Sequence, residues 1–162
     1  MNERSDALHP EQAADRATMP SASIRRRLRR ICVVSPNRSA LIPHGVLLVD
    51  DQPEFLQVAQ ALLAGQPDLS VIGTATSGEE AIRLVTALAP DVVVLDVQMP
   101  GLSGFETARR MVACSPGLRI VMVSADGEPD YPRFARSAGA EAFLTKKELL
   151  AGALPPLLGA AR

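Results

Sequence analysis

Short apolar runs alternate with segments of helical spacing from residue 45 onward. The runs lie at 46–49, 69–75, 92–95, 120–123 and 142–145. The run at 92–95 contains only Val and Leu, which is typical of a strand covered on both faces. Five alternating strand and helix units predict an α/β fold with a parallel sheet and right-handed crossovers.

The segments between the runs carry helix start and stop signals. A helix is predicted over 52–64, because apolar residues recur there at helical spacing, with Pro53 near the start and Gly65 past the end. Further helices are predicted over 78–88, 103–114 and 132–138, and a last helix is predicted from Glu148. Pro155-Pro156 should break or kink this last helix, because proline lacks the backbone donor that a helix interior needs.

Polar residues follow four of the five runs. Asp50 and Asp51 follow the first, Asp96 the third, Ser124 the fourth and Lys146 the fifth. Ligands of an open parallel sheet bind outside the carboxyl ends of its strands, so these side chains should share one pocket. The second strand contributes nothing to that pocket and is placed at the edge. The prediction is a doubly wound, five-stranded parallel sheet in the order 2-1-3-4-5.

Charge divides the chain into two parts. Residues 1–44 carry eight arginines and four acids, whereas the rest carries nine basic and fourteen acidic residues. Prolines, an arginine cluster at 25–30 and little apolar periodicity predict a disordered basic arm at 1–44. It is followed by a domain at 45–158 and a tail at 159–162. The arm is either a charge-based contact for nucleic acid or an acidic partner, or a solvated tail or misplaced coding start.

Composition excludes several classes of protein. Two cysteines, Cys32 and Cys114, form no disulfide framework, which indicates a reducing compartment. No apolar run approaches the length that spans a bilayer, and early acidic residues oppose a signal peptide. One tyrosine, four phenylalanines and no tryptophan supply few side chains for base stacking. We therefore expect a cytoplasmic chain that contacts no membrane and does not bind nucleic acid on its own.

Four motifs together resemble the receiver domain of bacterial two-component response regulators over about residues 45–157. They are Val-Asp-Asp at 49–51, Leu-Asp-Val-Gln-Met-Pro-Gly at 95–101 followed by Ser-Gly at 103–104, Ser-Ala at 124–125, and Leu-Thr-Lys at 144–146. The resemblance implies a flavodoxin-like three-layer sandwich and a stand-alone receiver similar to chemotaxis regulators. The sequence is most similar to receivers that are joined to a helix-turn-helix DNA-binding domain. Too few residues follow Leu157 to form such a domain.

The acidic residues are expected to hold Mg²⁺. Three carboxylates in one pocket repel one another unless they share a cation, and Mg²⁺ prefers oxygen ligands. The resemblance implies that Asp51 ligates the metal directly, Asp50 largely through water and Asp96 with one oxygen. It also implies that the backbone carbonyl of Gln98 supplies a further ligand.

The resemblance makes Asp96 the acceptor of a phosphoryl group from a histidine kinase or phosphotransfer protein. Phosphoryl transfer depends on positioning and charge neutralisation, which Lys146 and the Ser124 hydroxyl would provide. The chain would then be a phosphorylation-dependent switch rather than an enzyme, since it only phosphorylates and slowly dephosphorylates itself.

The switch itself is assigned to Ser124 and Phe143. By resemblance, Ser124 moves toward the phosphoryl group and Phe143 rotates into the released space, which alters the face of the fourth helix, fifth strand and fifth helix. That face would contact an unknown downstream protein, or a second copy in a dimer linked to phosphorylation. Gln98 and Asp126 are expected to set the lifetime of the phosphate by positioning or excluding the attacking water.

Other interpretations stay open at this point. In isolation, Asp51 is read as a helix cap, Asp96 as a turn residue, Lys146 as solvated, Ser124 as bonded to backbone and Phe143 as a core residue. Two alternative functions are the receiver part of a transcriptional regulator without its DNA-binding domain and a phosphatase of the haloacid dehalogenase type. The latter would require a second acid at position 98, where this chain has glutamine.

Overall fold

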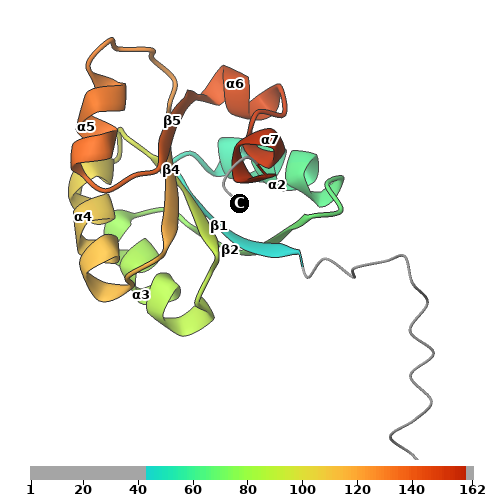
Figure 1. The fold of residues 1–162 in the computed structure, drawn as a ribbon, viewed down its shortest axis with the longest axis horizontal. Coiled ribbons are helices and arrows are strands. Elements are labelled where there is room, and N and C mark those ends of the chain that lie inside the picture. The colour runs from blue at the N-terminus through green and yellow to red at the C-terminus, as the bar shows by residue number, and fades with distance from the viewer. Residues whose placement is uncertain (1–42, 160–162) are drawn as a thin grey trace, which may run out of the picture. The chain divides into compact units, whose positions relative to one another are not determined.

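The computed structural model of the protein describes residues 43–159 (Figure 1). The predicted basic arm lies outside the described residues apart from positions 43 and 44, as do residues 160–162 of the tail. The strands are β1 (His44–Val49), β2 (Leu69–Ala75), β3 (Val92–Asp96), β4 (Arg119–Ser124) and β5 (Ala142–Thr145). The helices are α2 (Pro53–Ala64), α3 (Gly78–Leu88), α4 (Gly104–Cys114), α5 (Tyr131–Ser137), α6 (Lys146–Leu150) and α7 (Leu154–Gly159).

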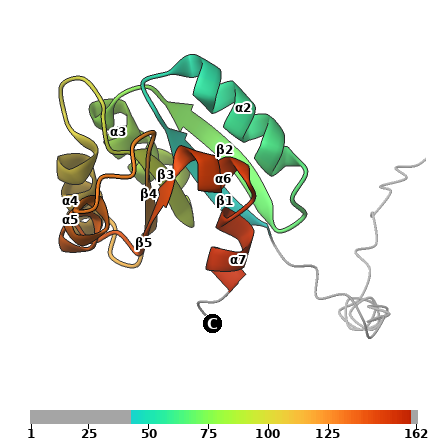
Figure 2. The same ribbon diagram turned by 90° about the horizontal axis from the view of Figure 1, so that it is seen from above.

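The five strands form one parallel sheet in the order β2-β1-β3-β4-β5. Helices α3, α4 and α5 cover one face, and α2, α6 and α7 cover the other (Figures 1 and 2). This arrangement confirms the predicted strand order and the flavodoxin-like sandwich. The order reverses between β1 and β3, so the carboxyl ends of these strands flank the crevice where ligands bind in such folds.

Two apolar clusters fill the space between the sheet and its helices. Successive side chains of a strand point to opposite faces, so each central strand contributes to both clusters. The side chains that point toward α3, α4 and α5 are Leu47, Val49, Val93, Leu95, Ile120 and Met122. Those that point toward α2, α6 and α7 are Val46, Leu48, Val92, Val94, Val121 and Val123. Burial on both faces explains why these strands read as unbroken apolar runs.

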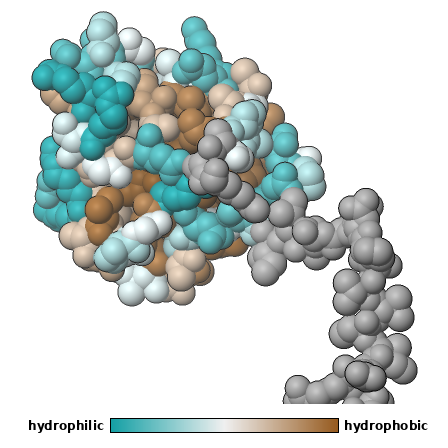
Figure 3. All heavy atoms as spheres, in the orientation of Figure 1, coloured by the Kyte–Doolittle hydropathy of each residue, from teal (hydrophilic) through white to brown (hydrophobic). Residues whose placement is uncertain are grey.

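The exposed large apolar side chains are spread over the surface. Figure 3 shows hydrophobic residues (brown) in patches between hydrophilic ones (teal) on the face drawn. The large apolar side chains exposed among the described residues come from five different elements: Val58, Ile72, Leu88, Phe134 and Leu150. Scattered exposure of this kind is ordinary for a folded domain. Within residues 43–159, the structure contains no helix with the length and hydropathy needed to cross a membrane.

The C-terminal helices correct one prediction. The prolines do not interrupt a helix that starts at Glu148. The interruption falls earlier, around Gly152 with φ +86°, and Pro155-Pro156 lie in the first turn of α7, where backbone donors have no helical partner anyway. Helix α6 begins before Glu148 because Thr145 accepts a hydrogen bond from the Glu148 N–H while the Glu148 carboxylate accepts one from the Thr145 N–H.

Candidate functional site

The carboxyl ends of β1, β3, β4 and β5 bring the predicted site residues together. Carboxylate oxygens of Asp50, Asp51 and Asp96 lie within 4.8 Å of one another. Lys146 Nζ lies 2.6 Å from Asp50 Oδ2 and 3.5 Å from Asp96 Oδ1. Asp96 and Ser124 are the last residues of neighbouring strands, and both are buried. Residues separated by up to 96 positions in the chain thus form one acidic pocket with a single lysine at its side.

A repeated turn orients the side chains at three of these strand ends. In each, an oxygen of the strand-end side chain accepts a hydrogen bond from the backbone N–H two residues later, a turn that Asp and Ser favour. The bonds join Gln52 to Asp50 Oδ1 at 3.0 Å, Gln98 to Asp96 Oδ2 at 3.2 Å, and Asp126 to Ser124 Oγ at 3.2 Å. The turns at Asp50 and Asp96 each fix one carboxylate oxygen, and the other oxygen of each aspartate faces Lys146.

The pKa of Asp96 reports the charge balance of the pocket. The side chain is buried, with an exposed fraction of 2%. Burial raises the pKa of Asp96 to about 6, against an ordinary value of 3.8. Lys146 opposes this increase, while the neighbouring charges of Asp50 and Asp51 add to it. Lys146 alone therefore leaves the three carboxylates short of positive charge.

Two carboxylate oxygens of the pocket are suited to a metal ion. Asp51 Oδ1 is buried without a hydrogen-bond partner, and Asp50 Oδ2 makes an ion pair with Lys146 that lacks hydrogen-bond geometry. Buried acceptors of this kind are costly unless something compensates them. A hard divalent cation with oxygen ligands, such as Mg²⁺, fits this donor set. The alternative role of Asp51 as a helix cap finds no support, because Gln52 occupies the cap position of α2.

Helix α4 packs directly on the backbone of Asp96. Its first residue, Gly104, lies so close that a Cβ there would overlap the Asp96 carbonyl. The Gly104 N–H donates to the Val97 carbonyl at 3.1 Å, and Ser103 caps the helix by accepting from the Glu106 N–H. The Ser-Gly pair that was predicted to open a helix thus also sets how closely α4 approaches Asp96.

The predicted switch residues lie on adjacent strands. Phe143 is opposite Met122 in the β4–β5 pairing and is half-buried against the apolar cluster under α3, α4 and α5. Ser124 is opposite Thr145 and is fully buried. Their role as a switch stays a prediction, as do the carbonyl ligand of Gln98 and the effect of Gln98 and Asp126 on phosphate lifetime.

Sequence reasoning missed two aromatic residues beside the site. The Lys146 ammonium lies 4.5 Å from the centre of the Phe55 ring, a favourable cation–π contact from α2. The amide Nε2 of Gln98 donates to the hydroxyl of Tyr131 at 3.2 Å. The available signal for Tyr131 was that it is the only tyrosine in the chain and follows the fourth strand closely.

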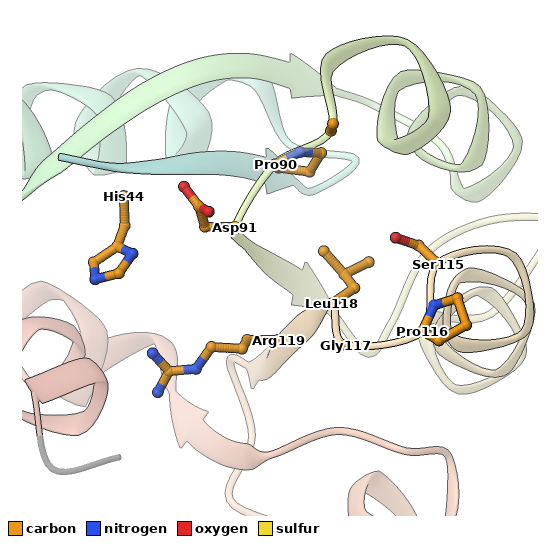
Figure 4. Close-up of a pocket in the computed structure, with 9 residues that line it drawn as sticks. His44, Pro90, Asp91, Ser115, Pro116, Gly117, Leu118 and Arg119 are labelled. Carbon is orange, nitrogen blue, oxygen red and sulfur yellow. The ribbon is translucent and has the colours of Figure 1, made fainter. Parts of the chain in front are cut away.

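A separate pocket lies at the opposite ends of the strands (Figure 4). His44 and Arg119 begin β1 and β4, and Asp91 precedes β3. Its charged groups serve the fold, since Asp91 Oδ2 accepts from the Gly45 N–H at 2.7 Å and Arg119 forms two hydrogen bonds of 2.7 Å with Glu141. This pocket contributes no group to the acidic site.

Comparison with known proteins agrees with this geometry. A family model described as the response regulator receiver domain matches residues 46–152. The response regulator GacA of Pseudomonas syringae is 39% identical over 101 residues, or 62% of this chain and 47% of that protein. The protein-glutamate methylesterase/protein-glutamine glutaminase 2 of Methanospirillum hungatei is 49% identical over 79 residues, or 49% of this chain and 22% of that protein.

A solved structure shares the same fold. It is the CheX-CheY-BeF3-Mg²⁺ complex of Borrelia burgdorferi, with a TM-score of 0.66, 26% identity, and coverage of 74% of this chain and 90% of the matched chain. The chain spans less than half the length of the two curated relatives. The strand order, the acidic pocket and the family match over residues 46–152 lead to one conclusion: this chain belongs to the response regulator receiver domain family.

Proposed function

We propose that this chain is a phosphorylation-dependent signalling switch in which Asp96 accepts a phosphoryl group from a phosphohistidine of a sensor kinase or phosphotransfer protein. The observation that carries the proposal is the grouping of Asp96 with two further carboxylates and Lys146 at the strand ends. Transfer would form a bond from an Asp96 oxygen to phosphorus and break the bond from phosphorus to the donor nitrogen, which keeps the electron pair.

The surroundings of Asp96 support its role as acceptor. The Gln98 N–H fixes one oxygen of Asp96, and the other lies 3.5 Å from Lys146 Nζ. Lys146 would pair with phosphoryl oxygens, and the Ser124 hydroxyl, whose oxygen accepts from Asp126, keeps its proton free for donation. Both groups stabilise negative charge on a transferring phosphoryl group.

Asp50, Asp51 and Asp96 would hold Mg²⁺, with the Gln98 carbonyl as a further ligand. The ion would neutralise negative charge on the carboxylates and on the phosphoryl oxygens. Support comes from the buried oxygens of Asp50 and Asp51 and from the Mg²⁺ named in the Borrelia burgdorferi complex.

The signal would leave through the face formed by α5, β5 and α6, with Ser124 and Phe143 as the switch. A downstream protein, or a second copy of the chain, would bind there; the complex of CheY with CheX is a precedent for a partner protein. We place the chain in the cytoplasm, because Cys114 is free and exposed, as expected in a reducing compartment.

Phosphorylation is tested by incubating the protein with a small phosphodonor and Mg²⁺ and measuring intact mass. Wild type should gain one phosphoryl group, and Asp96→Asn should gain none. Asp68→Asn, the same change at an exposed acid outside the pocket, is the matched control and should be labelled like wild type. Labelling of Asp96→Asn to the wild-type level contradicts the proposal. Steady, multiple turnover of a small phosphoester by the wild type would instead favour a phosphatase.

Phosphate lifetime is assigned to Gln98 and Asp126, each two residues beyond a buried site residue. Both side chains are exposed beside the pocket, where they would position or exclude the attacking water. The decay of the labelled protein in Gln98→Ala and Asp126→Ala checks this assignment. Half-lives equal to wild type in both variants would remove it.

A further inference from the structure

Tyr131 connects the acidic site to the aromatic residues of the neighbouring helices. Its hydroxyl accepts a hydrogen bond of 3.2 Å from Gln98 Nε2, although the two residues are 33 positions apart. Gln98 follows β3, and Tyr131 is the first residue of α5. The bond therefore joins the segment after β3 to the segment after β4, beside the two strand ends that carry Asp96 and Ser124.

The ring of Tyr131 is held on two sides. Its centroid lies 5.8 Å from that of Phe105 on α4 and 5.9 Å from that of Phe143 on β5, both in edge-to-face geometry. Phe105 in turn contacts Phe134 at 5.9 Å. Such pairs stabilise a fixed ring orientation, so the hydroxyl is presented at a defined place.

Gln98 is fixed at both ends as a result. Its backbone N–H donates to Asp96 Oδ2 at 3.2 Å, and its side-chain amide donates to Tyr131. The Gln98 side chain is exposed, so without the second bond it would be free to sample its rotamers in water. With the bond, the exposed side chain is held between the end of β3 and the start of α5, two residues after the buried Asp96.

We infer that Tyr131 is a positioning residue that holds Gln98 as a shield over the phosphorylated site and thereby prolongs the phosphorylated state. The inference rests on the proposed function. In hydrolysis, a water oxygen attacks phosphorus, the bond from phosphorus to the Asp96 oxygen breaks, and the carboxylate leaves with the electron pair. One water proton stays on the phosphate and the other passes to solvent. A fixed Gln98 restricts the approach of that water.

Tyr131→Phe isolates the hydroxyl, because the ring contacts with Phe105 and Phe143 are retained. We expect the aspartyl phosphate to decay faster by about two- to tenfold, the range that corresponds to one hydrogen bond. Gln98→Ala should accelerate decay similarly, and the double variant should decay no faster than Gln98→Ala alone, since the tyrosine acts through the glutamine. Phe134→Leu, which changes the aromatic cluster without touching Gln98, is the control and should decay like wild type.

The outcomes separate the two proposals. Wild type that takes no label at Asp96 would overturn both the proposed function and this inference. Labelled wild type that decays at the same rate as Tyr131→Phe would overturn this inference alone. An acceleration by Tyr131→Phe that persists in full on the Gln98→Ala background would also overturn it, because the tyrosine would then act through general packing.

Discussion

Asp96 carries a charge that burial opposes. Its pKa in the folded protein is about 6, above the ordinary 3.8, so the folded state binds this proton more tightly than the unfolded state. The stabilisation that follows is complete below about pH 4 and is lost as pH rises through about 6. At pH 7 the ionised side chain therefore lowers the free energy of unfolding.

Asp96→Asn should accordingly stabilise the metal-free protein at pH 7. We expect an increase in the free energy of unfolding on the order of 1–3 kcal/mol at pH 7, and an increase near zero at pH 4, where Asp96 is protonated. Urea unfolding in the absence of divalent cations at both pH values measures this difference. Asp126→Asn, an exposed acid nearby, is the control and should change little. An equal effect of Asp96→Asn at both pH values would show that the buried negative charge is not the source of the destabilisation.

The charged and hydroxyl residues of the site could be predicted because they stand directly after apolar runs. Strand ends of a parallel sheet converge whatever the details of packing, so Asp96 and Lys146 meet by topology alone. Phe55 and Tyr131 could not be assigned in this way. Their contacts depend on how α2 and α5 rotate against the sheet. The pattern of apolar positions indicates only that Phe55 lies on the apolar face of its helix, and Tyr131 precedes the helix predicted over 132–138.

Helix α6 determines where Lys146 stands. Lys146 is its first residue, directly after the cap residue Thr145, whose hydroxyl accepts from the Glu148 N–H at 3.2 Å. The Glu148 carboxylate accepts from the Thr145 N–H at 2.7 Å, which completes the capping box. The position of the site lysine thus depends on a local helix cap as well as on the sheet.

Thr145→Ala should both destabilise the protein and slow its labelling. Loss of a cap of this kind costs about 1 kcal/mol of unfolding free energy. Labelling with the small phosphodonor should slow as well, because the first turn of α6 would no longer hold Lys146 in a fixed position. Thr86→Ala on the exposed side of α3 is the matched control for both measurements. Thr145→Ala with stability and labelling rate equal to Thr86→Ala would show that the box does not position the lysine.

Element boundaries could be predicted where the sequence carries a start or stop signal that the prediction took into account. Helix α3 and strand β2 have the predicted boundaries, 78–88 and 69–75, whereas α6 begins earlier than predicted. The Thr-Lys-Lys-Glu segment at 145–148 contains a capping signal, but the prediction relied on Pro155-Pro156 and did not use it. Proline is compatible with the first helical turn, so the pair lies in the first turn of α7, which begins at Leu154, instead of ending α6.

For the whole molecule, the acidic pocket couples cation binding to folding. A ligand that binds only the folded state stabilises it by about 2.7 kcal/mol at 100 times its dissociation constant. Millimolar Mg²⁺ should therefore raise the melting temperature of the wild type, and Asp51→Asn should lose most of that gain. Sodium chloride at matched ionic strength separates specific binding from screening. An equal Mg²⁺ response of wild type and Asp51→Asn would contradict Asp51 as a ligand.

The strand order could be deduced because a strand without a site residue belongs at the edge. The long-range ion pair of Arg119 could not be deduced. Arg119 joins Glu141, 22 residues away, through two bonds of 2.7 Å, and donates to the Leu158 carbonyl at 3.3 Å. This contact requires that β4, the start of β5 and the end of α7 lie close together. No local pattern in the sequence predicts that they do.

The direct passage from β5 into α6 has a consequence for how related chains vary in length. Thr145 ends the strand and Lys146 opens the helix, so no connecting residues lie between them. One residue added or removed between positions 143 and 146 would turn the lysine to the other side of the sheet. Insertions and deletions should therefore be absent from this junction in family members that keep the lysine. They should gather in irregular stretches such as 65–68, between α2 and the start of β2, where a change in length moves no residue of the pocket.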